Sequence, residues 1–164
     1  MPEKAKELKG LLNTQIKAVG VFMDEKVETV AKLLNDGIID IAQLHGNEND
    51  EYIKKLRGLS EKPIIKAFRV VAKKDIADIE ICCADYVLLD SGTGSGKTFD
   101  WELIRSVKRP YFLAGGLGLD NVESAIKLLH PFALDVSSGI ESNGIKDKDK
   151  MTAFAHAVRK ENKL

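Results

Sequence analysis

The sequence has few cysteines, no net charge and no long apolar run, and each absence argues against a class of protein. Its two cysteines, Cys82 and Cys83, are adjacent, so they predict neither a disulfide framework nor the ligand spacing of a zinc site. Lys plus Arg and Asp plus Glu number 25 each, which argues against a nucleic-acid partner. No apolar run is long enough to cross a bilayer, and the charged N-terminus lacks a signal-peptide core. We therefore expect a reduced, cytoplasmic protein without metal or membrane contact.

What the chain does contain is a repeat of apolar runs and helical segments. Its 164 residues, 44% of them hydrophobic, suffice for one domain, 1–164, with a substantial core. Strands are predicted at short apolar runs rich in β-branched or aromatic residues, at 17–23, 38–44, 63–68, 84–90, 110–114 and 131–137. Helical spacing of apolar residues lies between them, as in 27–34, 52–56 and 122–129. Such alternation predicts an α/β protein with parallel strands, as a doubly wound sheet or a βα barrel.

Regular spacing of the strands favours the barrel, although six strands are two short of the usual eight. The chain also begins with a predicted amphipathic helix, residues 2–12, that no strand precedes. Both observations are expected if the first βαβ unit of a barrel is missing and strands 3 to 8 are present.

Two glycine-containing turns follow the last two predicted strands. Gly115-Gly116 follows 110–114, with Asp120 as the expected N-cap of the next helix, and Ser138-Gly139 follows Ser137. Glycines let backbone N–H groups approach an anion, and the next helix adds its positive end. Each turn alone could be an ordinary βα connection, but together they match the phosphate site that barrels build after strands 7 and 8. We therefore predict a phosphate-binding site here.

Other strand ends carry side chains suited to catalysis or binding. Asp90 ends an apolar strand, where desolvation can bring a carboxyl pKa toward neutrality and suit it to acid–base catalysis. Gln43 and His45 point the same way by strand alternation, toward the mouth of a barrel. Asp24 and Lys66 could also face a pocket. Cys82 and Cys83 precede a strand, at the opposite end from this chemistry, and are expected to be packing residues.

The loop after Asp90 contains Gly96-Lys97-Thr98, which is the end of a P-loop pattern. The pattern requires glycine five positions before Gly96, where this chain has Ser91. A nucleotide-binding function is thus the weaker alternative, and a mobile lid over the pocket is the preferred interpretation of the loop.

Five blocks resemble phosphoribosylanthranilate isomerases of tryptophan biosynthesis: VGVFMDE, IAQLHG, YVLLDSGTGSGKTFDW, FLAGGLGLDNV and PFALDVSSGIE. The resemblance implies an eight-stranded barrel that rearranges N-(5-phosphoribosyl)anthranilate to an aminoketose phosphate without a cofactor. It implies that Asp90 is the general acid that protonates the ring oxygen as the sugar opens. It further implies that the substrate phosphate binds at Gly115, Gly116, Ser137, Ser138 and Gly139. Gln43, His45 and Asp135 would line the pocket.

The chain departs from the family pattern at its N-terminus. The family's cysteine base, in a Lys-Ile-Cys-Gly motif ending strand 1, has no counterpart here, nor does the arginine after strand 2. Loss of a general base typically removes ~10²–10⁴-fold of the rate. The alternatives are an isomerase completed by a separate N-terminal fragment, a start codon placed too late, or a non-catalytic phosphate-binding remnant. Open strand edges, such as Val19–Phe22, also predict self-association or binding of the complementing fragment.

Overall fold

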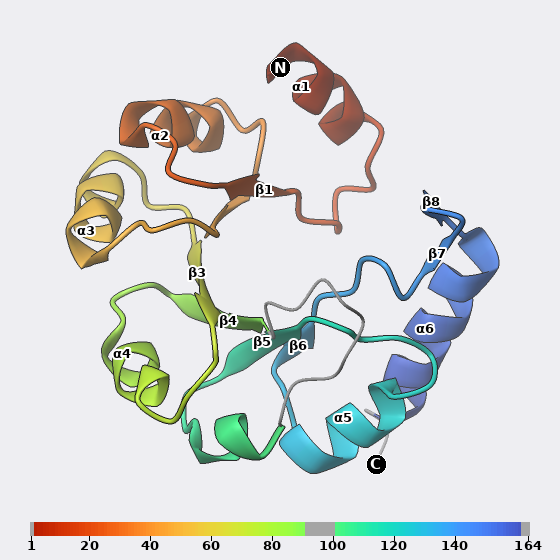
Figure 1. The fold of residues 1–164 in the computed structure, drawn as a ribbon. Coiled ribbons are helices and arrows are strands. Elements are labelled where there is room, and N and C mark those ends of the chain that lie inside the picture. The colour runs from red at the N-terminus through yellow and green to blue at the C-terminus, as the bar shows by residue number, and fades with distance from the viewer. Residues whose placement is uncertain (1, 91–100, 162–164) are drawn as a thin grey trace. The chain divides into compact units, whose positions relative to one another are not determined.

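The computed structural model describes residues 2–90 and 101–161, in which strands and helices alternate along the chain (Figure 1). The main strands are β1 (Val19–Phe22), β2 (Ile41–Leu44), β3 (Ile64–Arg69), β4 (Tyr86–Asp90), β5 (Tyr111–Ala114) and β6 (Ala133–Leu134). The helices are α1 (Pro2–Gly10), α2 (Val27–Asn35), α3 (Asp50–Leu59), α4 (Asp75–Ile81), η1 (Trp101–Ser106), α5 (Val122–Leu129) and α6 (Lys148–Glu161). All six predicted strands are confirmed, although β6 is much shorter than expected.

The six strands form one sheet in the order β1-β2-β3-β4-β5-β6, which is their order in the sequence. β1 pairs parallel with β2, β2 with β3, and β5 with β6. Neighbouring parallel strands need a crossover between them, and the helices supply it. This arrangement confirms the α/β fold with a parallel sheet, and it places the carboxyl ends of paired strands side by side.

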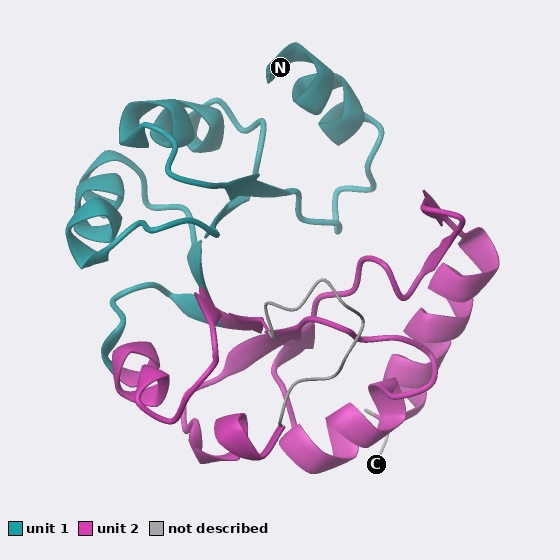
Figure 2. Cartoon of the chain, viewed as in Figure 1, with its two compact units in different colours: residues 1–67, 81–87 teal, residues 68–80, 88–164 magenta. Residues whose placement is uncertain are grey.

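Contacts within the chain divide it into two compact units (Figure 2). The first comprises residues 1–67 and 81–87, and the second comprises 68–80 and 88–164. In the first unit, the apolar faces of α2 and α3 are buried as their helical spacing predicts, through Val27, Val30, Ala31, Leu34, Ile53 and Leu56. In the second unit, α5 buries Val122, Ala125 and Leu129. Each unit therefore has its own set of fully buried aliphatic side chains.

A two-stranded hairpin, β7 (Glu141–Ser142) and β8 (Ile145–Lys146), follows β6 and was not expected from the sequence. Its turn is Asn143-Gly144, and both residues have positive φ, 53° and 76°. Asn-Gly is the preferred pair for a tight two-residue hairpin turn because both positions need that conformation. The pair was thus a local signal for the hairpin. No helix in the described part of the chain is long and apolar enough to cross a membrane.

Candidate functional site

The first predicted phosphate turn follows β5 in the second unit. Gly115 and Gly116 have φ of 86° and 65°, a conformation that L side chains rarely adopt, so this turn requires glycine. The Asn121 side chain holds the turn, since it accepts a hydrogen bond from the Gly118 N–H (3.0 Å) and donates to the Gly116 carbonyl (2.9 Å). Asn121, not Asp120, occupies the N-cap of α5, which corrects the expected cap. The cap residue here shapes the loop rather than bonding to the first turn of the helix.

The second predicted phosphate turn follows β6 and meets the first. Backbone hydrogen bonds from Ile140 to Ser137 (3.2 Å) and from Glu141 to Ser138 (3.0 Å) fold it tightly. Gly139 forms an isolated parallel bridge with Gly118 of the first turn. A Cβ at Gly139 would lie 1.9 Å from the Leu117 carbonyl oxygen, so the close approach depends on glycine. The two turns are therefore neighbours, as the sequence predicted.

Sequence reasoning missed a cation beside these turns. Lys146, on β8, donates to the Ser137 carbonyl (3.0 Å) and hydroxyl (2.9 Å). It also pairs with Glu141 (2.6 Å), and its side chain is about half exposed. Because the hairpin itself was not anticipated, nothing in the linear sequence connected Lys146 with Ser137. The structure thus adds a positively charged group to a turn that otherwise offers backbone and hydroxyls.

The two predicted carboxylates lie in the same unit as the turns. Asp90 is the last residue of β4 and is half-buried, with its carbonyl accepting a hydrogen bond from the Val70 N–H (3.2 Å). Asp135 directly follows β6, is exposed, and donates its N–H to the Leu113 carbonyl (2.8 Å). Asp90 therefore stands at a strand end, as expected, whereas Asp135 was expected within a longer strand and instead follows the short β6. The Gly/Ser/Lys loop 91–100, with its lid and P-loop interpretations, lies outside the described residues.

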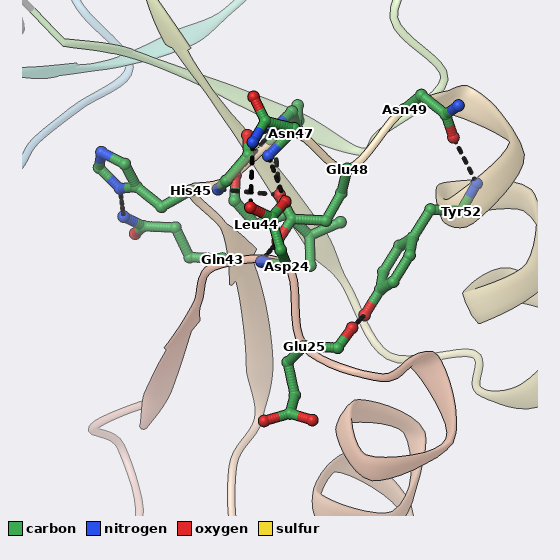
Figure 3. Close-up of polar contacts among 11 residues, drawn as sticks. Asp24, Glu25, Gln43, Leu44, His45, Asn47, Glu48, Asn49 and Tyr52 are labelled. Carbon is green, nitrogen blue, oxygen red and sulfur yellow. Dashed lines mark hydrogen bonds and ion pairs between the residues drawn. The ribbon is translucent and has the colours of Figure 1, made fainter.

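Gln43 and His45 lie in the first unit, at the end of β2. Gln43 is buried and His45 is half-buried. The Gln43 Nε2 and His45 Nδ1 atoms are 3.1 Å apart, and Figure 3 shows the two side chains lying together. This contact confirms that the two residues share one side of the strand. A hydrogen bond between an amide and an imidazole helps to fix the orientation of the ring.

Asp24 and Lys66, which the sequence left open, are both engaged in contacts with the loop after β2. Asp24 accepts hydrogen bonds from the Asn47 backbone (2.6 Å) and side chain (3.0 Å). Lys66 forms an ion pair with Glu48 (3.2 Å), and both of these side chains are buried. Glu48 was not singled out from the sequence, because a lone glutamate in a polar stretch carries no pattern.

A cavity of about 470 Å³ lies in the first unit among the loops after β1 and β2. Its lining is mostly charged or polar and includes Asp24, Glu25, Glu28, Asn47, Tyr52 and Lys55. Burial and the nearby glutamates raise the pKa of Tyr52 to about 12, so its hydroxyl is neutral and donates to the Glu25 carbonyl (2.8 Å). Neither Gln43 nor His45 lines this cavity, so it is separate from the predicted site residues.

The cysteines only partly match the sequence prediction. Cys82 is buried, as expected of a packing residue, but Cys83 is exposed, which corrects the prediction for it. The Cys83 thiol lies 3.3 Å from the Asp50 carboxylate, and burial together with that carboxylate raises the pKa of the thiol. A raised pKa disfavours the reactive thiolate. Among residues 2–90 and 101–161, no group of three His, Cys, Asp or Glu side chains could hold a metal ion.

Comparison with known proteins gives a consistent result. The family described as N-(5'phosphoribosyl)anthranilate (PRA) isomerase matches residues 1–157. The N-(5'-phosphoribosyl)anthranilate isomerase of Endomicrobium trichonymphae is 42% identical over 160 residues, which cover 94% of this chain and 78% of that protein. The Clostridium acetobutylicum enzyme of the same name is 43% identical over 166 residues, covering 96% of this chain and 80% of that protein.

Solved structures agree with the sequence relatives. The phosphoribosyl anthranilate isomerase of Thermotoga maritima superposes with a TM-score of 0.86 at 36% identity, covering 98% of this chain and 81% of that one. A phosphoribosyl anthranilate isomerase in complex with reduced 1-(o-carboxyphenylamino)-1-deoxyribulose 5-phosphate gives a TM-score of 0.84 at 34% identity, covering 98% and 80%. Since these matches extend over nearly the whole chain, it belongs to the phosphoribosylanthranilate isomerase family.

Proposed function

We propose that this chain binds N-(5'-phosphoribosyl)anthranilate and acts in its isomerisation to the 1-deoxyribulose phosphate. Membership of the family supports the reaction. The bridge between Gly118 and Gly139 is the main support for the position of the phosphate site. It joins two turns that follow adjacent paired strands, β5 and β6, and the N-terminus of α5 lies beside one of them. Backbone N–H groups and a helix N-terminus together favour a phosphate. The substrate phosphate would bind at Gly115, Gly116, Ser137, Ser138 and Gly139.

Asp90 is the proposed general acid. Its place at the end of β4, half-buried, is suitable for a carboxyl group that must hold a proton and give it up. It would protonate the ring oxygen as the C1–O bond breaks and the sugar opens. Gln43, His45 and Asp135 would contact the rest of the substrate. The reaction needs no cofactor, because the substrate's own amine can assist ring opening.

The test of this function is a pair of measurements on the full chain. Isomerase turnover is followed by the change in anthranilate fluorescence, and binding of the reduced deoxyribulose phosphate by calorimetry. Asp90→Asn should abolish whatever turnover the wild type shows while leaving analogue binding within about two-fold, because the amide keeps shape but cannot donate the proton. An unchanged rate would refute Asp90 as the acid. Binding without turnover in the wild type would favour the non-catalytic remnant.

We also propose that the six strands correspond to strands 3 to 8 of an eight-stranded barrel, in one domain of residues 1–164 in the cytoplasm. The 160 residues matched by one relative are 78% of its length, so that protein extends about 45 residues beyond the match. A βαβ unit needs about 30 residues or more. The two compact units alternate along the chain, with 68–80 and 81–87 in different units, which supports a single folding domain.

The proposed partner is a complementing βαβ fragment or a second copy of this chain. β1 stands at one end of the strand order, and its Val19 and Val21 are 43% and 60% exposed. α1 contains no buried residue, and Leu8, Leu11, Leu12 and Ile16 in and after it are exposed. Exposed apolar residues on an edge strand favour pairing with another strand. The alternative is an in-frame sequence upstream of Met1 that encodes a strand ending in Lys-Ile-Cys-Gly. In that case the βαβ unit and the cysteine base would belong to the same chain.

A further inference from the structure

The first unit contains a buried ion pair that the proposed mechanism does not use. Lys66, in β3, and Glu48, after β2, have side chains only 9% and 1% exposed. Burying two charges costs desolvation free energy, and apolar side chains of similar size often give equal or greater stability. A stabilising contribution is therefore a weak explanation for this pair. Apolar side chains, however, could not form the hydrogen bonds that hold backbone N–H and carbonyl groups in place.

The pair does hold such groups, at the ends of β1 and β2. The Lys66 ammonium donates to the carbonyls of Gly46 (2.7 Å) and Leu44 (3.4 Å) as well as to Glu48 (3.2 Å). The Glu48 carboxylate accepts from the N–H groups of Asp24 (2.7 Å) and Gly46 (2.9 Å). Asp24 follows β1, Gly46 follows β2, and Lys66 lies within β3. We call Asp24, Gly46, Glu48 and Lys66 the strand-end clamp.

The clamp leaves little freedom to the loop that carries His45. Asp24 has φ of 55°, and its carboxylate binds the Asn47 N–H (2.6 Å), as Figure 3 shows. A Cβ at Gly46 would lie 2.7 Å from the Asp24 backbone nitrogen, so any other residue would force the two loops apart. The His45 N–H donates to the Phe22 carbonyl (2.7 Å) of β1. The backbone is thus held at His45 itself and on its C-terminal side.

We infer that Lys66 and Glu48 are positioning residues, which hold the Gln43–His45 pair in the orientation that contacts the non-phosphate part of the substrate. The inference rests on the proposed function. His45 is one residue from Gly46, whose N–H and carbonyl are both bound by the clamp, and its ring contacts Gln43 on the same strand end. A small rotation of this backbone would displace the imidazole. The phosphate turns share no residue with the clamp, so phosphate recognition should not depend on it.

The test compares two ligands on the full chain by calorimetry: reduced 1-(o-carboxyphenylamino)-1-deoxyribulose 5-phosphate, and inorganic phosphate alone. Lys66→Met keeps most of the length of the side chain but removes its charge and donors. We expect it to weaken analogue binding at least about ten-fold while phosphate binding changes less than about two-fold. Lys32→Met is the matched control, because the Lys32 ammonium pairs with Asp36 at an exposed site. It should leave both affinities unchanged.

Because Lys66→Met leaves the Glu48 carboxylate buried without its cation, Glu48→Gln is a second variant, which keeps the lysine and removes the negative charge instead. Its carbonyl oxygen can still accept the Asp24 N–H, but its amide nitrogen cannot accept from the Gly46 N–H or from Lys66, so we expect a selective loss of analogue affinity here too. Equal losses for both ligands would mean a merely structural role and would overturn the inference. So would wild-type affinity for the analogue in either variant. A wild-type chain that binds neither ligand would overturn the proposed function, and the role of the clamp with it.

Discussion

Gly118 and Gly139 lie opposite each other in a parallel bridge between two loops, and no side chain fits at the second position. The built Cβ of Gly139 falls 1.9 Å from the Leu117 carbonyl oxygen and 2.8 Å from the Gly118 Cα. These are backbone atoms, so relief requires the two loops to separate. The proximity of the two proposed phosphate turns therefore depends on this one glycine.

Gly139→Ala should lower phosphate affinity by at least about ten-fold and destabilise the fold by roughly 1–3 kcal/mol, the usual cost of overpacking. Calorimetry with inorganic phosphate and urea unfolding measure the two effects. Gly58→Ala is the control, since nothing lies within 4 Å of a Cβ at this position in α3. It should stabilise the chain by about 0.5–1 kcal/mol, because alanine favours helix over glycine. Unchanged phosphate affinity in Gly139→Ala would place the phosphate elsewhere.

Lys146→Met should weaken phosphate binding and make what remains less dependent on salt. The lysine donates to the Ser137 hydroxyl and carbonyl, so it both supplies positive charge and fixes one proposed phosphate turn. Its exposure and its pairing with Glu141 limit the loss to about three- to ten-fold. Phosphate titrations at two ionic strengths give both quantities. Lys55→Met, which disrupts an exposed pair with Glu28 in the first unit, should have no effect.

Stability should fall at alkaline pH because Tyr111 resists ionisation in the fold. Burial raises its pKa to about 12, whereas an unfolded tyrosine titrates near 10. The folded state then holds a proton that the unfolded state has lost, so stability is full below pH ~10 and declines as pH rises toward ~12. A two-unit difference corresponds to roughly 2–3 kcal/mol at most.

Tyr111→Phe tests this assignment. It should cost about 1 kcal/mol at neutral pH, because it removes the hydrogen bond from the hydroxyl to the Leu129 carbonyl (3.0 Å). It should also flatten the decline in unfolding free energy between pH 9 and 11, measured by urea titration at each pH. An equally steep decline in the variant would assign the alkaline effect to other groups, such as Tyr52, whose pKa is also about 12.

Val21→Lys should reduce self-association. Val21 is 60% exposed on β1, and a charged side chain on an edge strand discourages pairing with another strand. Light scattering across a concentration series measures the oligomeric state. Val71→Lys is the control, as Val71 is similarly exposed but lies outside the strands. A wild-type chain that is monomeric at all concentrations and unfolds cooperatively would argue against both proposed partners.

Much of the fold was predictable from local pattern. The apolar faces of α2 and α5 and the positions of the main strands follow from spacing, because a buried face must repeat with the period of its element. The glycines after β5 were predictable for a similar reason, since positive φ is a local demand of the backbone. The hairpin at Asn143-Gly144 carried a local signal too, in the two positive-φ residues of its turn.

The sequence by itself determined the positions of the main strands and helices, the strand-end position of Asp90, and the two Gly/Ser turns, because these depend on residues close together in the chain. Only the tertiary structure decided that Gly139 bridges Gly118, that Lys146 reaches Ser137, and that Lys66 pairs with Glu48. It also showed that Asn121 rather than Asp120 is the N-cap of α5, and that Cys83 is exposed to solvent. Most of these contacts join residues brought together by strand pairing or loop closure. Such proximity is set by the whole fold, and no short stretch of sequence records it.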